Sequence, residues 1–151
     1  MTQLSVRPTS GGVPIRSAWD AVASVLQEAG MQLLRAGGPG AVDAAEEVRV
    51  HVERWYRLEG EFDSLPLVVP DSVISGLREL EEQMSHARVP EVVSFLGLLA
   101  SLTAAFSRVV GDRPGFAGSS FERQLRMLVR SADLVHESVV AYLPADGPGR
   151  L

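Results

Sequence analysis

The sequence contains no cysteine, and this absence excludes several kinds of chemistry. A chain without thiols has no disulfide framework, no thiolate metal site and no cysteine nucleophile. Lysine is absent too, so all 14 basic residues are arginine. A Schiff-base mechanism and a phosphate-binding loop with its lysine are therefore excluded. The lysine-free composition has two interpretations, GC-rich codon usage or selection against modification of lysine amines.

Catalytic and targeting motifs are missing as well. The sequence has no GxGxxG, GxSxG or HExxH pattern, so it shows no signature of a dinucleotide-binding protein, a serine hydrolase or a zinc protease. The first 16 residues (MTQLSVRPTSGGVPIR) lack the apolar segment of a Sec signal peptide. We expect them to form a flexible arm; a signal for a specialised secretion machine is the alternative.

The length and composition of the chain are those of one folded domain. The chain has 151 residues, of which 46% are hydrophobic and 22% charged. Its net charge of −5 disfavours binding to nucleic acid and to anionic membranes. Residues 41–89 carry eleven acids against five arginines, a net charge of −6. This acidic side favours a basic partner surface.

Apolar residues recur at helical spacing in five segments, beginning near residues 17, 41, 71, 91 and 119. Ser17 with Asp20, and Ser119 with Glu122, predict helix starts of the capping-box type. Gly37 and Pro90 predict helix ends. We therefore expect an all-α antiparallel bundle of about five helices over residues 17–143, with a disordered tail at 144–151.

The longest apolar run, residues 92–107 (VVSFLGLLASLTAAFS), carries no charge. It is shorter than the roughly 20 residues that a membrane-spanning helix needs, and no basic cluster or aromatic belt flanks it. The other helices also have apolar stripes that require a partner. We therefore predict that residues 91–110 form a buried central helix, with Leu99 in the core and Ser101 at a more tolerant position.

The histidines are the first candidates for metal binding. His51 follows Glu47 by four residues, and His136 follows Asp133 by three, loosely like the carboxylate–histidine pairs of di-iron bundles. Glu59 is the one acid that interrupts an apolar seam. A di-iron site needs more inward carboxylates than this, so we predict surface or boundary histidines, no metal site and no cofactor.

Arg130 and His136 form an R-x5-H spacing on the last long helix. This spacing resembles the R-x4–6-H motif of HEPN-domain ribonucleases, which are also small helical bundles. The resemblance covers two residues and implies that they act on an RNA 2′-hydroxyl and phosphate across a dimer interface. Ser131 departs from the polar amide or acid that often follows the arginine in that family.

The sequence favours a non-enzymatic protein-interaction module: an adaptor, chaperone-like or assembly subunit in the cytoplasm. Surplus apolar residues point to a homo-oligomer or to a groove for a partner's amphipathic helix. These candidate partner-binding residues form a second stripe on the last helix and an apolar loop: Met127, Leu134, Ala141, Leu67, Val68 and Val69. The HEPN-like ribonuclease is the alternative function.

Overall fold

The computed structural model describes residues 12–143, which form five long helices, one short helix and two three-residue strands. The order of elements is β2 (Gly12–Pro14), α1 (Ile15–Ala36), α2 (Ala41–Arg57), α3 (Glu59–Asp63), β3 (Val68–Pro70), α4 (Asp71–Met84), α5 (Val89–Val110) and α6 (Ser120–Tyr142). The two strands pair antiparallel, with Val13 opposite Val69. The predicted all-α bundle of about five helices is confirmed.

The starts of α5 and α6 agree with the sequence signals at Pro90 and Ser119. The Ser119 hydroxyl accepts a hydrogen bond from the Glu122 N–H at 3.1 Å, and the Glu122 carboxylate reaches back to the Gly118 N–H at 2.6 Å. Pro90 lies in the first turn of α5, where its missing N–H leaves no bond unmade. The predicted start at Ser17 is wrong, because α1 begins two residues earlier, directly after Pro14.

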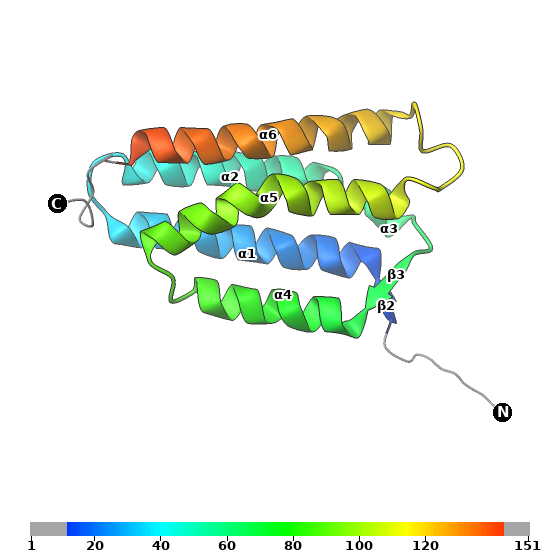
Figure 1. Cartoon of the computed structure of the whole chain (residues 1–151), viewed down its shortest axis with the longest axis horizontal. Coiled ribbons are helices and arrows are strands. Elements are labelled where there is room, and N and C mark those ends of the chain that lie inside the picture. The colour runs from blue at the N-terminus through cyan, green and yellow to red at the C-terminus, as the bar shows by residue number, and fades with distance from the viewer. Residues whose placement is uncertain (1–11, 144–151) are drawn as a thin grey trace.

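Helix α1 holds the central position in the bundle. It packs against α2, α4 and α5, and it buries nine side chains, more than any other helix of the described chain. Figure 1 shows α4 below α1, α6 along the upper edge, and α2 behind α5 and α6. Most sequential helices run antiparallel, as predicted, but α1 and α4 run in the same direction because α2, α3 and β3 return the chain.

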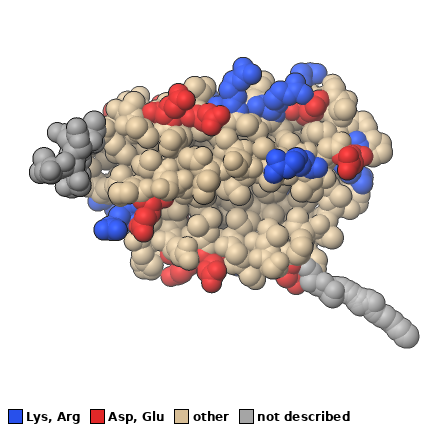
Figure 2. Space-filling model, viewed as in Figure 1, with Lys and Arg blue, Asp and Glu red and all other residues tan. Residues whose placement is uncertain are grey.

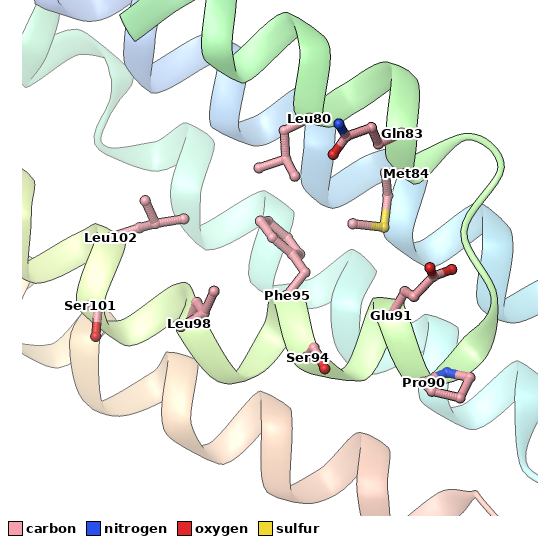
Figure 3. Close-up of a pocket in the computed structure, with 10 residues that line it drawn as sticks. All are labelled: Leu80, Gln83, Met84, Pro90, Glu91, Ser94, Phe95, Leu98, Ser101 and Leu102. Atoms are coloured by element: carbon pink, nitrogen blue, oxygen red, sulfur yellow. The ribbon is translucent and has the colours of Figure 1, made fainter.

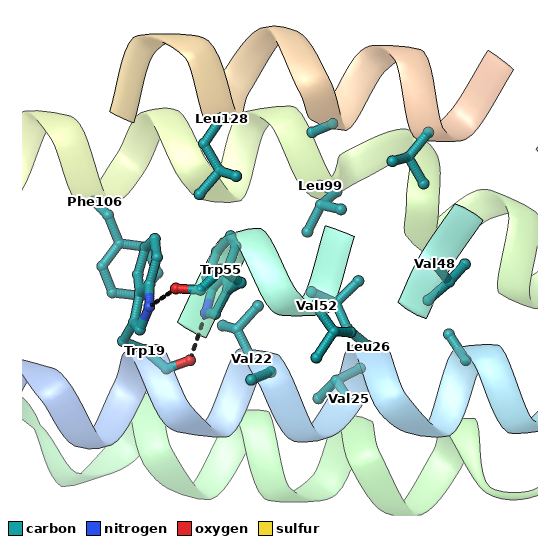
Figure 4. Close-up of a cluster of buried hydrophobic side chains, with 14 of the residues drawn as sticks. Trp19, Val22, Val25, Leu26, Val48, Val52, Trp55, Leu99, Phe106 and Leu128 are labelled. Atoms are coloured by element: carbon teal, nitrogen blue, oxygen red, sulfur yellow. Dashed lines mark hydrogen bonds between the residues drawn. The ribbon is translucent and has the colours of Figure 1, made fainter. Parts of the chain in front are cut away.

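Two tryptophans join α1 to α2 at the core. The indole N–H of Trp19 donates to the carbonyl of Trp55 at 2.8 Å, and the Trp55 indole donates to the carbonyl of Trp19 at the same distance (Figure 4). The rings stack with centroids 3.7 Å apart. Phe62 stacks on the other face of Trp19, and Phe106 packs edge-on. Both indole donors are thereby satisfied inside the core.

The apolar helix α5 is buried on one face only. Leu99 is fully buried, as predicted, and six further side chains of α5 reach the core. Leu98, however, is 61% exposed, and only 33% of the most apolar window of the helix is buried. By length and composition α5 could cross a membrane. The expectation of a helix covered on all sides is therefore wrong for its outer face.

Three further expectations need correction. Residues 12–16 belong to β2 and α1 rather than to a flexible arm, because the Ile15 N–H bonds to the Leu67 carbonyl at 2.9 Å. In α4 the buried residues are Ile74 and Met84, whereas Val73, which the helical spacing predicts in the apolar seam, is exposed. Tyr142, which the helical spacing predicts as the last residue of the apolar seam of α6, is exposed. Residues 1–11 and the predicted tail at 144–151 lie outside the described residues.

The turn before α2 meets the end of α6. Gly40 has a left-handed backbone with φ of +82°, and a Cβ at this position would lie 1.9 Å from the Tyr142 carbonyl oxygen. Only glycine allows so close an approach in this conformation. Gly38, two residues earlier, is also left-handed but has open space around it.

Candidate functional site: two grooves on the bundle surface

The larger groove lies between α4 and α5. These helices are joined by a tight corner at Ser85–Arg88, then diverge, so that the space between them has a volume of about 660 Å³. Figure 3 shows Phe95 and Leu102 on α5 pointing toward Leu80 and Met84 on α4. The lining is mainly apolar, which is typical of grooves that receive a helix or an apolar ligand.

The outer face of α5 continues this groove. Ser94, Gly97, Leu98 and Ser101 are exposed along one side of the helix, and the first charged residue after Glu91 is Arg108. In Figure 2 the face over α5 is mostly uncharged, and acidic side chains line the lower edge over α4. An uncharged helix face beside an apolar groove is unusual for a surface that contacts only water.

A second groove, of about 460 Å³, lies between α2 and α6. Its apolar rim includes Met127 and Leu134, which are 70% and 56% exposed. Its basic lining comes from Arg54 and Arg57 on α2 and from Arg130 on α6. It therefore combines exposed apolar side chains with positive charge in a chain whose net charge is negative.

His51 lies fully buried at the α2–α6 interface, so the expectation of a surface or boundary histidine is wrong for this residue. Its Nδ1 is 3.3 Å from the Ser131 hydroxyl, which also accepts a hydrogen bond from the Arg54 guanidinium at 2.7 Å. Burial, and then the charge of Arg54, lower the pKa of His51 to about 4. His51 is therefore a neutral, structural side chain at neutral pH. Helical spacing puts His51 beside the charged face of α2. The spacing within one helix does not tell that α6 covers this flank.

A cluster of charges surrounds Arg16 at the start of α1. Its guanidinium is 3.2 Å from a carboxylate oxygen of both Glu59 and Asp63, and 3.4 Å from Asp20. Partial burial, and then the neighbouring Glu59, raise the pKa of Asp20 to about 6. Glu59, the acid that interrupts the α2 seam, is thus half-buried in an ion-pair network. This network joins α1 to α3, and neither groove includes it.

The six sequence-predicted partner-binding residues do not form one surface. Met127 and Leu134 lie on the rim of the α2–α6 groove, and Ala141 is exposed farther along α6. Leu67, Val68 and Val69 lie in and just before β3, at the opposite edge of the bundle from α6 in Figure 1. Of these three residues only Val68 is exposed, because β2 and α1 cover its neighbours.

The HEPN-like pair is also separated. Arg130 lines the groove that α6 forms with α2. His136 packs against α5, where a Cβ at Gly97 would lie 3.4 Å from its Nε2. The two side chains therefore face different neighbours, Arg130 toward α2 and His136 toward α5.

Within 12–143, no group of three histidine or carboxylate side chains is arranged to hold a metal ion. Comparison of the chain with protein-family models, with curated proteins and with solved structures gave no match. The two grooves are therefore the features of this chain that point to a function.

Proposed function

We propose that this chain is a non-enzymatic protein-interaction module that self-associates through α5 and the α4–α5 groove. The observation that carries the proposal is the exposed Leu98 on an uncharged helix face beside an apolar groove. Removing such a surface from water is favourable by about 25 cal/mol for each Å² of apolar area. Adaptor, chaperone-like and assembly subunits in the cytoplasm all fit this class.

The small residues on α5 support a helix as the occupant. Ser94 and Ser101 are exposed on the same side as Leu98 and add little bulk, whereas Gly97 faces His136 of α6. Small side chains let a second helix approach closely, so that its own apolar residues can enter the groove. A second copy of the chain supplies such a helix in α5 itself, and two copies of one face can meet around a twofold axis.

Sedimentation velocity over a concentration series tests the proposal. The chain is expected to show a concentration-dependent dimer mass. Leu98→Glu is expected to leave only the monomer, because a carboxylate would be buried without a partner. Val42→Glu is the matched control: Val42 is exposed, lies outside both grooves, and its variant should dimerise like the parent chain.

Two results would count against self-association. A monomeric mass at high concentration would contradict it directly. Dimers that persist in the Leu98→Glu variant would mean that the interface lies elsewhere than on α5. Circular dichroism of each variant is needed alongside, because a monomer counts as a result only when the helix signal matches that of the parent chain.

A further inference from the structure

The α2–α6 groove concentrates positive charge. Arg54, Arg57 and Arg130 all line it, and within residues 12–143 none of the three has a carboxylate within 4.0 Å. Arg57 could have paired with Glu53 one turn earlier, but Glu53 is bound by Arg49 instead. Figure 2 shows arginines along the upper edge of the bundle, over α6, with acidic side chains beside them. Three unneutralised guanidinium groups favour an anionic occupant.

The apolar rim adds a second requirement. Met127 and Leu134 are seven residues apart on α6, two helical turns, and both are largely exposed. The lining residues of α6 run from Gln124 to Leu134, a rise of about 15 Å at 1.5 Å per residue. An occupant that satisfies both features carries apolar groups at helical spacing and acids beside them.

One arginine of the groove is already held in place before a partner binds. Arg54 is held by its hydrogen bond to Ser131, so part of its side-chain entropy is lost before any partner arrives. His51 lies beneath the same hydroxyl and has no acid partner among the described residues. The positive charge therefore stays available at the surface rather than being neutralised from below.

We infer that the α2–α6 groove binds an acidic amphipathic helix of a partner protein. The apolar side of that helix packs on Met127 and Leu134, and its carboxylates meet the guanidinium groups of Arg54, Arg57 and Arg130. Charge complementarity selects this occupant over a basic helix. The site shares no residue with the α4–α5 groove, so it can be occupied whether or not the chain self-associates.

A displayed library of random 16-residue peptides, selected on the purified chain, tests the inference. Enriched peptides are expected to be net negative, with apolar residues at positions i, i+3 or i+4, and i+7. Isothermal titration calorimetry of the best peptide should show at least about tenfold weaker binding to an Arg57→Ala/Arg130→Ala variant and to Met127→Ser. Binding should also weaken between 50 and 500 mM NaCl, because salt screens exposed charges.

Matched variants separate this site from the other surfaces. Arg35→Ala removes an exposed arginine outside the groove and should bind the peptide like the parent chain. Leu98→Glu should also bind it normally, so loss of self-association does not affect this test. The substituted arginines are exposed, and circular dichroism of each variant confirms that its helices are intact.

Three outcomes would overturn the inference. One is a selection that enriches nothing, or only neutral or basic peptides. Another is an acidic peptide whose affinity survives the double arginine substitution. The third is a labelled 20-nucleotide single-stranded RNA that binds more tightly than any peptide and whose binding is lost in the same double variant. That result would mean that the arginines bind phosphate groups.

Discussion

The reciprocal tryptophan pair makes a specific prediction about stability. Trp55→Phe keeps an aromatic ring against Trp19 but removes the indole N–H that donates to the Trp19 carbonyl at 2.8 Å. That carbonyl also lies within α1, so we count only the net value of a hydrogen bond, about 1 kcal/mol. The smaller ring leaves a void of roughly two methyl groups, at about 1 kcal/mol each. The expected loss in the free energy of unfolding is about 3 kcal/mol.

Urea denaturation followed by circular dichroism measures this loss. A change of about 3 kcal/mol corresponds to a fall in Tm of roughly 6–12 °C for a domain of this size. Tyr56→Phe is the matched control, because Tyr56 is the next residue on α2 and is exposed. It should change the free energy by less than about 0.5 kcal/mol.

A double-mutant cycle shows whether the two rings act together. Trp19→Phe and Trp55→Phe should be non-additive by about 0.5–3 kcal/mol, since the rings stack and exchange hydrogen bonds. A loss below about 1 kcal/mol for Trp55→Phe, or strict additivity, would refute the reasoning. Either result would mean that the pair is not a cooperative contact.

Three further predictions concern stability. Leu99→Glu should prevent folding, because it buries a charge at a fully covered position, whereas the exposed Ser101→Glu should keep the helix signal in circular dichroism. Gly40→Ala should lower the free energy of unfolding by more than the roughly 1–2 kcal/mol expected for Gly38→Ala. Both positions have a left-handed backbone, but only Gly40 meets the end of α6. Equal losses in urea denaturation would contradict the close approach. His51 should lower stability as the pH drops from 6.5 toward 4, because the unfolded chain takes up a proton at His51 before the folded chain does, the folded pKa being about 4. Asp20, whose folded pKa is raised to about 6, acts in the opposite sense over the same range. His51→Gln should therefore be more stable at pH 4, relative to pH 6.5, than the parent chain, and an unchanged pH profile in urea denaturation would contradict this role of His51.

Helix boundaries could be predicted because their causes are local. Ser119 and Glu122 lie three residues apart in the sequence and make the N-terminal hydrogen bond that this spacing predicts. The start of α1 was missed for a tertiary reason. Pro14 has no side-chain cap to signal a helix start, and the Ile15 N–H finds its acceptor at Leu67, more than fifty residues away.

The candidate sites were predictable only in part. Met127 and Leu134 could be identified as exposed because they fall outside the apolar seam of their own helix. The arginines that face them belong to α2, and periodicity within one helix does not tell which neighbour lies beside it. The α4–α5 groove was missed for the same reason. Phe95 and Met84 are both buried in a regular seam, and only the divergence of the two helices after their corner opens the space between them.

The central position of α1 has a consequence for synthesis on the ribosome. Trp55 follows Trp19 by 36 residues, so the α1–α2 hairpin can close soon after α2 emerges. The other side of α1 contacts α4 and α5, and α5 ends only at Val110. At about 5–20 residues per second, that apolar side stays uncovered for several seconds during translation. The nascent chain is therefore most prone to aggregate, and most accessible to chaperones, during the interval before α5 has been made.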